Sequence, residues 1–203
     1  MHWNEFWRIF WEQAVDAGWL QWTAIVFGVA EVLLARVNNI LLYPAGIIST
    51  ALTIYILLVA GLYADSTLNA YYLVMSIYGW WYWKKRKDEP PLPVTWTTRR
   101  EWLVVAAIVA GGFVLGYELL SRFTPSTVPV WDAWVSATAW AGTWLLARRK
   151  IENWILLNVS NIFAVPLLFY KQLPMFAALT VFLFIVAVFG YFDWRKIYKS
   201  EPV

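Results

Sequence analysis

The sequence predicts an all-α integral membrane protein, with seven transmembrane helices in a 3+1+3 arrangement and an amphipathic helix at the N-terminus. Three observations lead to this prediction. Apolar residues make up 61% of the 203 residues and charged residues only 14%, whereas soluble globular proteins carry about 25% charged residues. The chain contains seven apolar runs close to the roughly 20 residues that a helix needs to cross a bilayer. Motifs at the ends of these runs recur at a constant spacing, which indicates an internal repeat.

The first element precedes the apolar runs and occupies residues 1–17. Trp3, Phe6, Trp7 and Phe10 recur at helical spacing, with charged and amide side chains mostly between them. This pattern is typical of an amphipathic helix that lies in the membrane interface. A helix that binds a partner protein is the alternative. The segment lacks the basic start and small-residue cleavage site of a signal peptide.

The transmembrane helices follow in two groups of three around one linker helix. Most breaks between them are short and polar, but residues 84–100 contain three prolines and are expected to form a solvated loop. The predicted units are the amphipathic helix (1–17), a first three-helix bundle with its basic loop (18–100), a linker helix (101–123) and a second three-helix bundle with a short tail (124–203). The predicted spans are 19–36, 39–60, 67–84, 101–121, 130–148, 152–170 and 174–194.

Basic residues are divided unevenly between the two sides of this topology. With seven spans, thirteen of the sixteen Lys and Arg residues fall on one side, and only Arg8, Arg122 and Lys171 fall on the other. The side of a membrane protein that is rich in Lys and Arg is cytoplasmic. We therefore expect a periplasmic N-terminus and a cytoplasmic C-terminus.

The two three-helix bundles share sequence motifs. Residues 33–36 and 145–148 both read Leu-Leu-Ala-Arg, at an offset of 112 residues. Residues 78–85 and 189–196 share an aromatic–Gly–aromatic motif followed by Trp and basic residues, at an offset of 111. Because an odd number of helices separates the copies, both have the same orientation in the membrane. This is the parallel repeat found in sugar carriers of the SWEET type, with the linker helix inverting the chain between the copies.

Polar side chains inside the predicted spans form stripes at helical spacing. Such side chains are costly in a bilayer and usually face a cavity or another helix. Interhelical hydrogen bonding is the alternative role, above all for Ser and Thr. Trp154 could stack on a flat ligand while the amides of Asn158 and Asn161 form hydrogen bonds with it. The candidate substrate-binding residues are Gln21, Glu31, Asn39, Tyr43, Thr50, Asn69, Tyr72, Ser76, Trp140, Thr143, Trp154, Asn158 and Asn161.

Glu31 is the only carboxylate at least four residues from both ends of a predicted span. It could neutralise a cationic ligand or pair with Arg36 or Arg148, and we favour the ion pair. No catalytic cluster accompanies it, because the chain has no Cys and its single His is His2. The sequence also lacks a Gly-rich phosphate loop and a metal-binding cluster. We therefore expect neither enzymatic activity nor a cofactor. The basic loop is explained by topology and anionic lipid rather than by nucleic acid.

Several motifs resemble the PnuC family of vitamin transporters and occur in the order seen in that family. They are NNILLYPAGIIS (38–49), GLYAD (61–65), YGWW (78–81), WDA (131–133) and ARRKIENW (147–154). The resemblance implies a SWEET-like fold in the bacterial inner membrane that takes up nicotinamide riboside by facilitated diffusion and alternating access. Phosphorylation by a separate cytoplasmic kinase, with no implied contact, would trap the substrate.

The same resemblance leaves thiamine, or another vitamin such as riboflavin, as the alternative substrate. It also implies a substrate site on the sixth span, where Trp154, Asn158 and Asn161 match the pattern of the family. A Trp-rich cavity suits a ring cation, because cation–π attraction contributes about 0.5–2 kcal/mol per contact. No chain of acidic residues crosses the membrane, so proton coupling is not expected. The aromatic-rich exterior would allow a homotrimer without requiring one.

Overall fold

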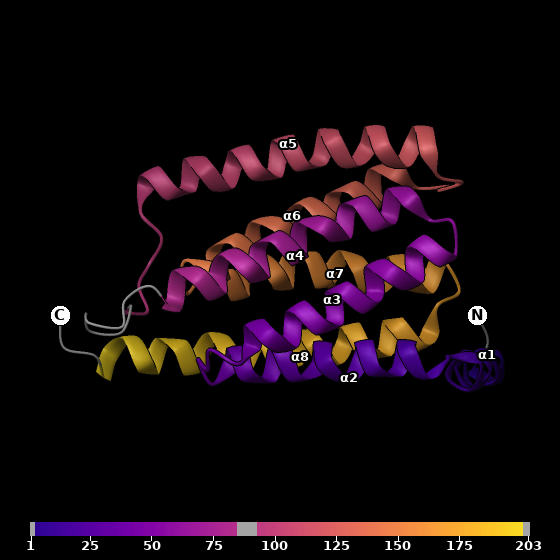
Figure 1. Ribbon diagram of the computed structural model, residues 1–203, viewed down its shortest axis with the longest axis horizontal. Helices are drawn as coiled ribbons and strands as arrows, with labels where there is room; N and C mark the ends of the chain where they lie inside the picture. Colours follow the sequence, from indigo (N-terminus) through magenta and orange to yellow (C-terminus); the bar gives the residue numbers. More distant parts are fainter. Residues whose placement is uncertain (1–2, 85–92, 201–203) are drawn as a thin grey trace.

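The structure is a computed structural model that describes residues 3–84 and 93–200 of the chain (Figure 1). The described residues form eight α-helices joined mostly by short turns. Their bounds are α1 Trp3–Asp16, α2 Trp19–Arg36, α3 Leu42–Val59, α4 Tyr63–Lys84, α5 Arg99–Phe123, α6 Pro129–Ala147, α7 Asn153–Tyr170 and α8 Pro174–Ser200. Each predicted span thus corresponds to one helix, and α8 extends furthest beyond its predicted end.

Five of the helices in the described part of the chain, α2, α3, α5, α7 and α8, are long and apolar enough to cross a membrane. The protein is therefore an all-α membrane protein. The sequence predicted seven spans, and the two that do not meet this criterion are α4 and α6. Helix α4 is rich in Tyr and Trp and α6 is rich in Trp and also contains Ser and Thr, which lowers their mean hydropathy.

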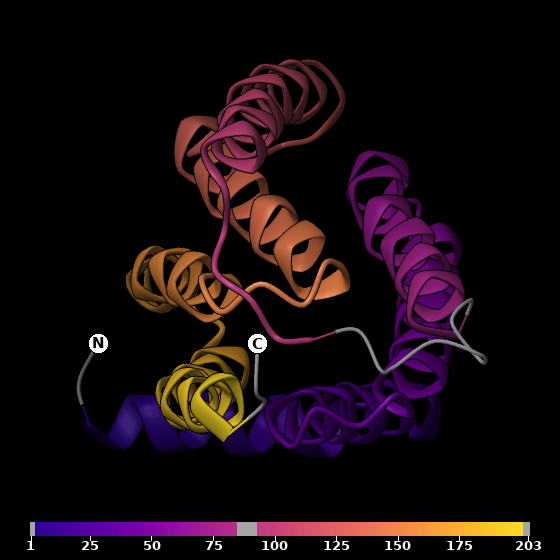
Figure 2. The ribbon, with the colours of Figure 1, turned by 90° about the vertical axis from the view of Figure 1, so that its left-hand side faces the viewer.

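The helices form two groups that pack against each other along their length. Helices α2, α3 and α4 pack in sequence, as do α6, α7 and α8, while α4 contacts α6 and α2 contacts α8. Helix α5 packs mainly on α6 and lies at the outer edge of the assembly (Figure 2). Helix α1 crosses the long helices at a steep angle and contacts α8 (Figures 1 and 2). Its location in the membrane interface stays a prediction.

The sequence repeat extends to the backbone and to side-chain hydrogen bonds. Helices α3 and α7 begin 111 residues apart, as do α4 and α8. The turn residues with positive φ follow the same spacing, since Asn38 corresponds to Arg149. Within the two groups, Ser49 donates to Ala24 O and Ser160 donates to Val135 O, both at 2.8 Å. The two groups therefore have the same internal geometry.

The carboxyl ends of α2, α4, α6 and α8 meet at one end of the assembly, which we call the basic end (Figure 1). The segment before α5 is bound to this end: Thr95 N–H donates to Arg149 O at 3.1 Å, and Glu152 accepts hydrogen bonds from the N–H and the hydroxyl of Thr97. The predicted solvated loop, 84–100, is thus partly packed against the second group. Residues 85–92 lie outside the described residues. The described basic residues of this end are Arg36, Lys84, Arg99, Arg100, Arg148, Arg149, Lys150, Arg195, Lys196 and Lys199.

Candidate functional site

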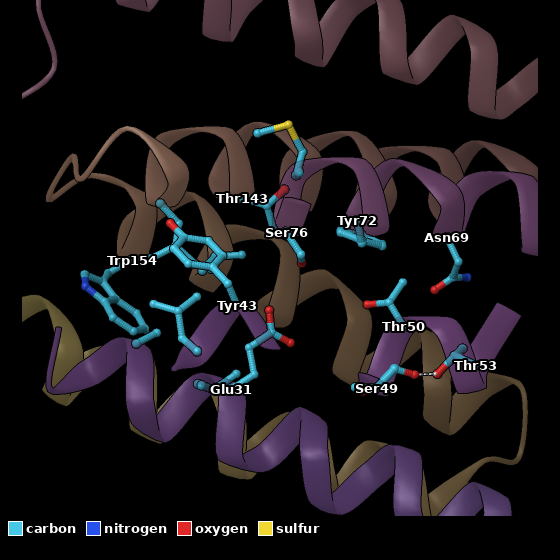
Figure 3. Close-up of a pocket in the computed structure, with 16 residues that line it drawn as sticks. Glu31, Tyr43, Ser49, Thr50, Thr53, Asn69, Tyr72, Ser76, Thr143 and Trp154 are labelled. Atoms are coloured by element: carbon cyan, nitrogen blue, oxygen red, sulfur yellow. Dashed lines mark hydrogen bonds between the residues drawn. The ribbon is translucent and has the colours of Figure 1, made fainter. Parts of the chain in front are cut away.

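A cavity of about 260 Å³, the central cavity, lies between the two groups of helices (Figure 3). Helices α2, α3 and α4 supply most of its lining, and Thr143, Leu146, Trp154 and Leu157 come from α6 and α7. Eight of the thirteen predicted site residues line it. These eight are Glu31, Tyr43, Thr50, Asn69, Tyr72, Ser76, Thr143 and Trp154.

A second cavity of about 630 Å³ adjoins the central cavity on the side away from the basic end. Gln21, another predicted residue, lines this adjoining cavity together with Phe176 of α8. Glu31 and Asn69 line both cavities. The two volumes therefore meet at these side chains and extend from the middle of the helices toward the amino ends of α2 and α8.

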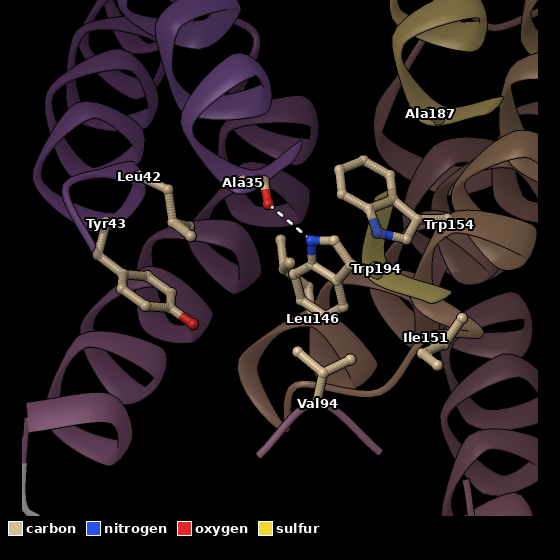
Figure 4. Packing of buried hydrophobic residues seen from close by; sticks show 9 residues of the cluster. All are labelled: Ala35, Leu42, Tyr43, Val94, Leu146, Ile151, Trp154, Ala187 and Trp194. Carbon is tan, nitrogen blue, oxygen red and sulfur yellow. Dashed lines mark hydrogen bonds between the residues drawn. The ribbon is translucent and has the colours of Figure 1, made fainter. Parts of the chain in front are cut away.

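The basic end of the central cavity is closed by two equivalent tryptophans, Trp83 and Trp194, which we call the indole pair. Trp83 Nε1 donates to Ala147 O at 3.0 Å, from the first group to the second. Trp194 Nε1 donates to Ala35 O at 2.9 Å, from the second group to the first (Figure 4). Each group thus contributes one indole that donates a hydrogen bond to the other group.

Two aromatic rings lie on the indole pair and face the cavity. Tyr43 packs on Trp83 with centroids 5.0 Å apart, and Trp154 packs on Trp194 at 5.7 Å, both at an interplanar angle of 88°. Gly79 and Gly190 make room for them, since a Cβ at either position would lie closer than 3.0 Å to the Tyr43 or the Trp154 ring.

The polar atoms of these two rings have no partner among the described residues. The Tyr43 hydroxyl and Trp154 Nε1 are both buried, and neither has a hydrogen-bond partner among the described residues. Buried polar atoms are rarely left unpaired, because each lost hydrogen bond costs about 1–3 kcal/mol. Neither atom is exposed to the central cavity in this conformation, so a bound molecule would form hydrogen bonds with them only after the two rings move.

Arginines add further contacts across the closed end. Arg36 pairs with Asp193 at 2.7 Å and lies over the Phe189 ring at 5.0 Å. In the other copy of the repeat, Arg148 lies over the Tyr82 ring at 4.7 Å.

The expected ion pair between Glu31 and one of these arginines is wrong. Arg36 reaches across to α8 instead of back along its own helix, so it is already paired.

The remaining predicted residues lie elsewhere. Asn39 is in the turn before α3, where its side-chain oxygen accepts the Leu41 N–H at 2.9 Å; the helix starts three residues later than predicted. Trp140 is buried where α4 meets α6 and stacks on Tyr71 at 4.6 Å. Asn158 and Asn161 are half-buried on α7 with their side chains 3.5 Å apart, and neither lines the central or the adjoining cavity.

Several lining residues were absent from the predicted set. Ser49 faces both cavities, and the repeat gave a signal for it because Ser160 occupies the equivalent position. Met75 and Leu157 also line the central cavity. Apolar side chains of this kind carry no signal in a sequence that is apolar throughout its spans.

Comparison with known proteins identifies the family. The family described as "Nicotinamide mononucleotide transporter" matches residues 18–196, nearly the whole chain. The chain belongs to this family. The predicted PnuC resemblance is thereby confirmed, and because this is a family of transporters, so is the prediction that the protein is not an enzyme.

Individual family members agree with this assignment. The chain is 24% identical over 176 residues to the nicotinamide riboside transporter PnuC of Escherichia coli (strain K12), covering 74% of each protein. The PnuC protein of Shigella flexneri gives the same values. A crystal structure of the vitamin B3 transporter PnuC is 25% identical, with a TM-score of 0.71 over 100% of this chain and 94% of the other. The protein is a multi-pass membrane transporter homologous to bacterial PnuC.

Proposed function

We propose that this protein carries nicotinamide riboside across the bacterial inner membrane by facilitated diffusion with alternating access. The observation that supports this most directly is the central cavity, which is lined from both groups by aromatic and polar side chains. Tyr43, Tyr72 and Trp154 offer faces for a flat pyridinium ring. Thr50 and Asn69 offer hydrogen-bonding groups for the ribose hydroxyls.

The proposed topology has seven spans, with α4 and α6 crossing the membrane beside the five apolar helices. Helices α2–α4 and α6–α8 would form a parallel repeat, and α5 would invert the chain between them. The excess of Lys and Arg makes the basic end cytoplasmic. In this orientation the adjoining cavity lies on the periplasmic side, and substrate would reach the central cavity through it.

The proposed transport cycle opens the end that is closed in this structure. The two groups would rock about the central cavity, as parallel repeats do in other carriers. Opening the basic end then requires both hydrogen bonds of the indole pair to break. Each contributes about 0.5–1.5 kcal/mol. A barrier of this size can be overcome without coupling to an ion gradient.

Transport in this proposal is downhill, and a separate cytoplasmic kinase makes it productive. Phosphorylation adds charge to the riboside, so the product no longer crosses by the same route. Among the described residues, Glu31 is the only carboxylate that lines the central cavity. A single carboxylate does not form a relay across the membrane, which argues against proton-driven uptake.

Thiamine is the alternative substrate, since it also combines a flat ring cation with a hydroxyl group. Riboflavin is a less suitable candidate for a cavity of about 260 Å³, because its ring system is uncharged and larger. The test is counterflow uptake of labelled nicotinamide riboside into proteoliposomes, with thiamine and riboflavin as competitors. We expect saturable uptake that excess unlabelled riboside abolishes. Saturable uptake of thiamine alone would favour the alternative, and uptake of none of the three would contradict the proposal.

A further inference from the structure

The central cavity contains an acidic side chain without a partner. Glu31 lines both cavities, and Figure 3 shows its carboxylate pointing from α2 into the space beside Tyr43 and Thr50. Within residues 3–84 and 93–200 it forms no ion pair or hydrogen bond. The two arginines expected to pair with it are engaged elsewhere: Arg36 with Asp193 at 2.7 Å, and Arg148 with Glu101 at 3.7 Å.

The neighbouring helix is shaped to admit this carboxylate. Gly46 of α3 lies directly opposite, and a Cβ there would collide with the Glu31 carboxylate oxygens. Any other residue at position 46 would therefore displace the charged group. The absence of a side chain at Gly46 thus provides the space that the Glu31 carboxylate occupies.

The charge is present in only one copy of the repeat. The structural repeat has an offset of 111 residues, so the position equivalent to Glu31 is Gly142, which has no side chain. Among the described residues that line the central cavity, one is therefore a carboxylate and the other polar residues are uncharged. Such a cavity complements a ligand with a single positive charge.

Keeping an unpaired carboxylate inside a membrane protein is costly. Desolvating an ion costs several kcal/mol unless another charge or a set of hydrogen bonds compensates it. None of the described residues supplies that compensation, whereas a bound cation would. The aromatic rings of Tyr43, Tyr72 and Trp154 would stabilise the same positive charge through their faces.

We propose that Glu31 determines the charge specificity of this transporter, by neutralising the ring cation of a small N-substituted aromatic substrate. This inference rests on the proposed function and adds the class of molecule that is accepted. A pyridinium or thiazolium ring would be bound. An uncharged ring of the same shape would be bound weakly, because it leaves the carboxylate without a partner.

The test compares two ligands that differ in charge but little in size: nicotinamide riboside and its uncharged 1,4-dihydro form. Calorimetry on the purified full-length protein gives the affinity for each. We expect Glu31→Gln, which removes the charge with little change of shape, to weaken binding of the cation roughly ten- to hundredfold. Binding of the dihydro form should change by no more than about twofold, because its ring carries no charge to lose.

Two further variants separate charge from shape. Gly46→Ala keeps the carboxylate but displaces it, so it should also weaken binding of the cation more than that of the uncharged ligand. Glu118→Gln is the matched control, because Glu118 lies on α5 and pairs with Arg122 at 2.6 Å, far from the cavity. It should leave both affinities unchanged. The thermal unfolding midpoint of each variant reports whether the fold is intact.

The outcomes distinguish the two proposals. If Glu31→Gln weakens both ligands equally, or neither, Glu31 does not select charge and the inference is wrong, while the riboside assignment stands. If the parent protein binds thiamine but not the riboside, the assigned substrate is wrong, and Glu31→Gln measured with thiamine tests the role of the carboxylate. If the parent binds neither cation, both proposals fail.

Discussion

Replacing one member of the indole pair should open the basic end of the transporter. Trp194→Phe removes the N–H that donates to Ala35 O at 2.9 Å and keeps an aromatic ring against Trp154. One net hydrogen bond is worth about 0.5–1.5 kcal/mol. The ratio of closed to open molecules should therefore fall roughly two- to tenfold, since about 1.4 kcal/mol corresponds to a factor of ten. Trp83→Phe should have a similar effect, because the repeat gives Trp83 the equivalent bond to Ala147 O at 3.0 Å.

A single introduced thiol can measure this opening, because the chain has no Cys. Ala187 lies on α8 in the buried cluster at the basic end and is 2% exposed. In an Ala187→Cys background, a membrane-impermeant maleimide applied from the side of the basic end should label the thiol only when the two groups separate. Each indole variant should raise the labelling rate roughly two- to tenfold, and the effects on free energy should add in the double variant.

The matched control is Trp131→Phe. Trp131 Nε1 donates to Phe163 O at 2.9 Å, an equivalent bond in length and chemistry, but both residues belong to the second group. Its loss should not change the labelling rate, because no contact between the groups is broken. Equal acceleration by Trp131→Phe, or no acceleration by either indole variant, would show that the indole pair does not hold the basic end closed.

Three other predictions follow from the same structure. The exposed residues Thr67 and Arg100, changed to Cys, should be labelled from the periplasm and the cytoplasm respectively, and the reverse pattern would invert the topology. Uptake into proteoliposomes should be insensitive to uncouplers, whereas accumulation of unmodified substrate driven by a pH gradient would contradict downhill transport. Asn69→Leu should reduce substrate affinity about tenfold or more, and Asn158→Leu should have little effect; the opposite ranking would place the site on α7.

The sequence alone was sufficient for the helices, the repeat and the family. Apolar run length and polar breaks are local properties, so they located every long helix to within a few residues. The recurrence of Leu-Leu-Ala-Arg revealed a repeat that the structure extends to turns and to the hydrogen bonds of Ser49 and Ser160. The predicted site residues also included eight of the sixteen residues that line the central cavity.

Only the tertiary structure decided which polar side chains meet and which are already paired. Helical spacing assigns a side chain to a face of its own helix but does not give the rotation of that helix relative to its neighbours. For this reason the sequence did not separate Thr50, which lines the cavity, from Asn161 at the equivalent position, which does not. Glu31 shows the same limit: its expected partner lies five residues away on the same helix, but Arg36 is engaged by α8, whose approach depends on the packing of the two groups.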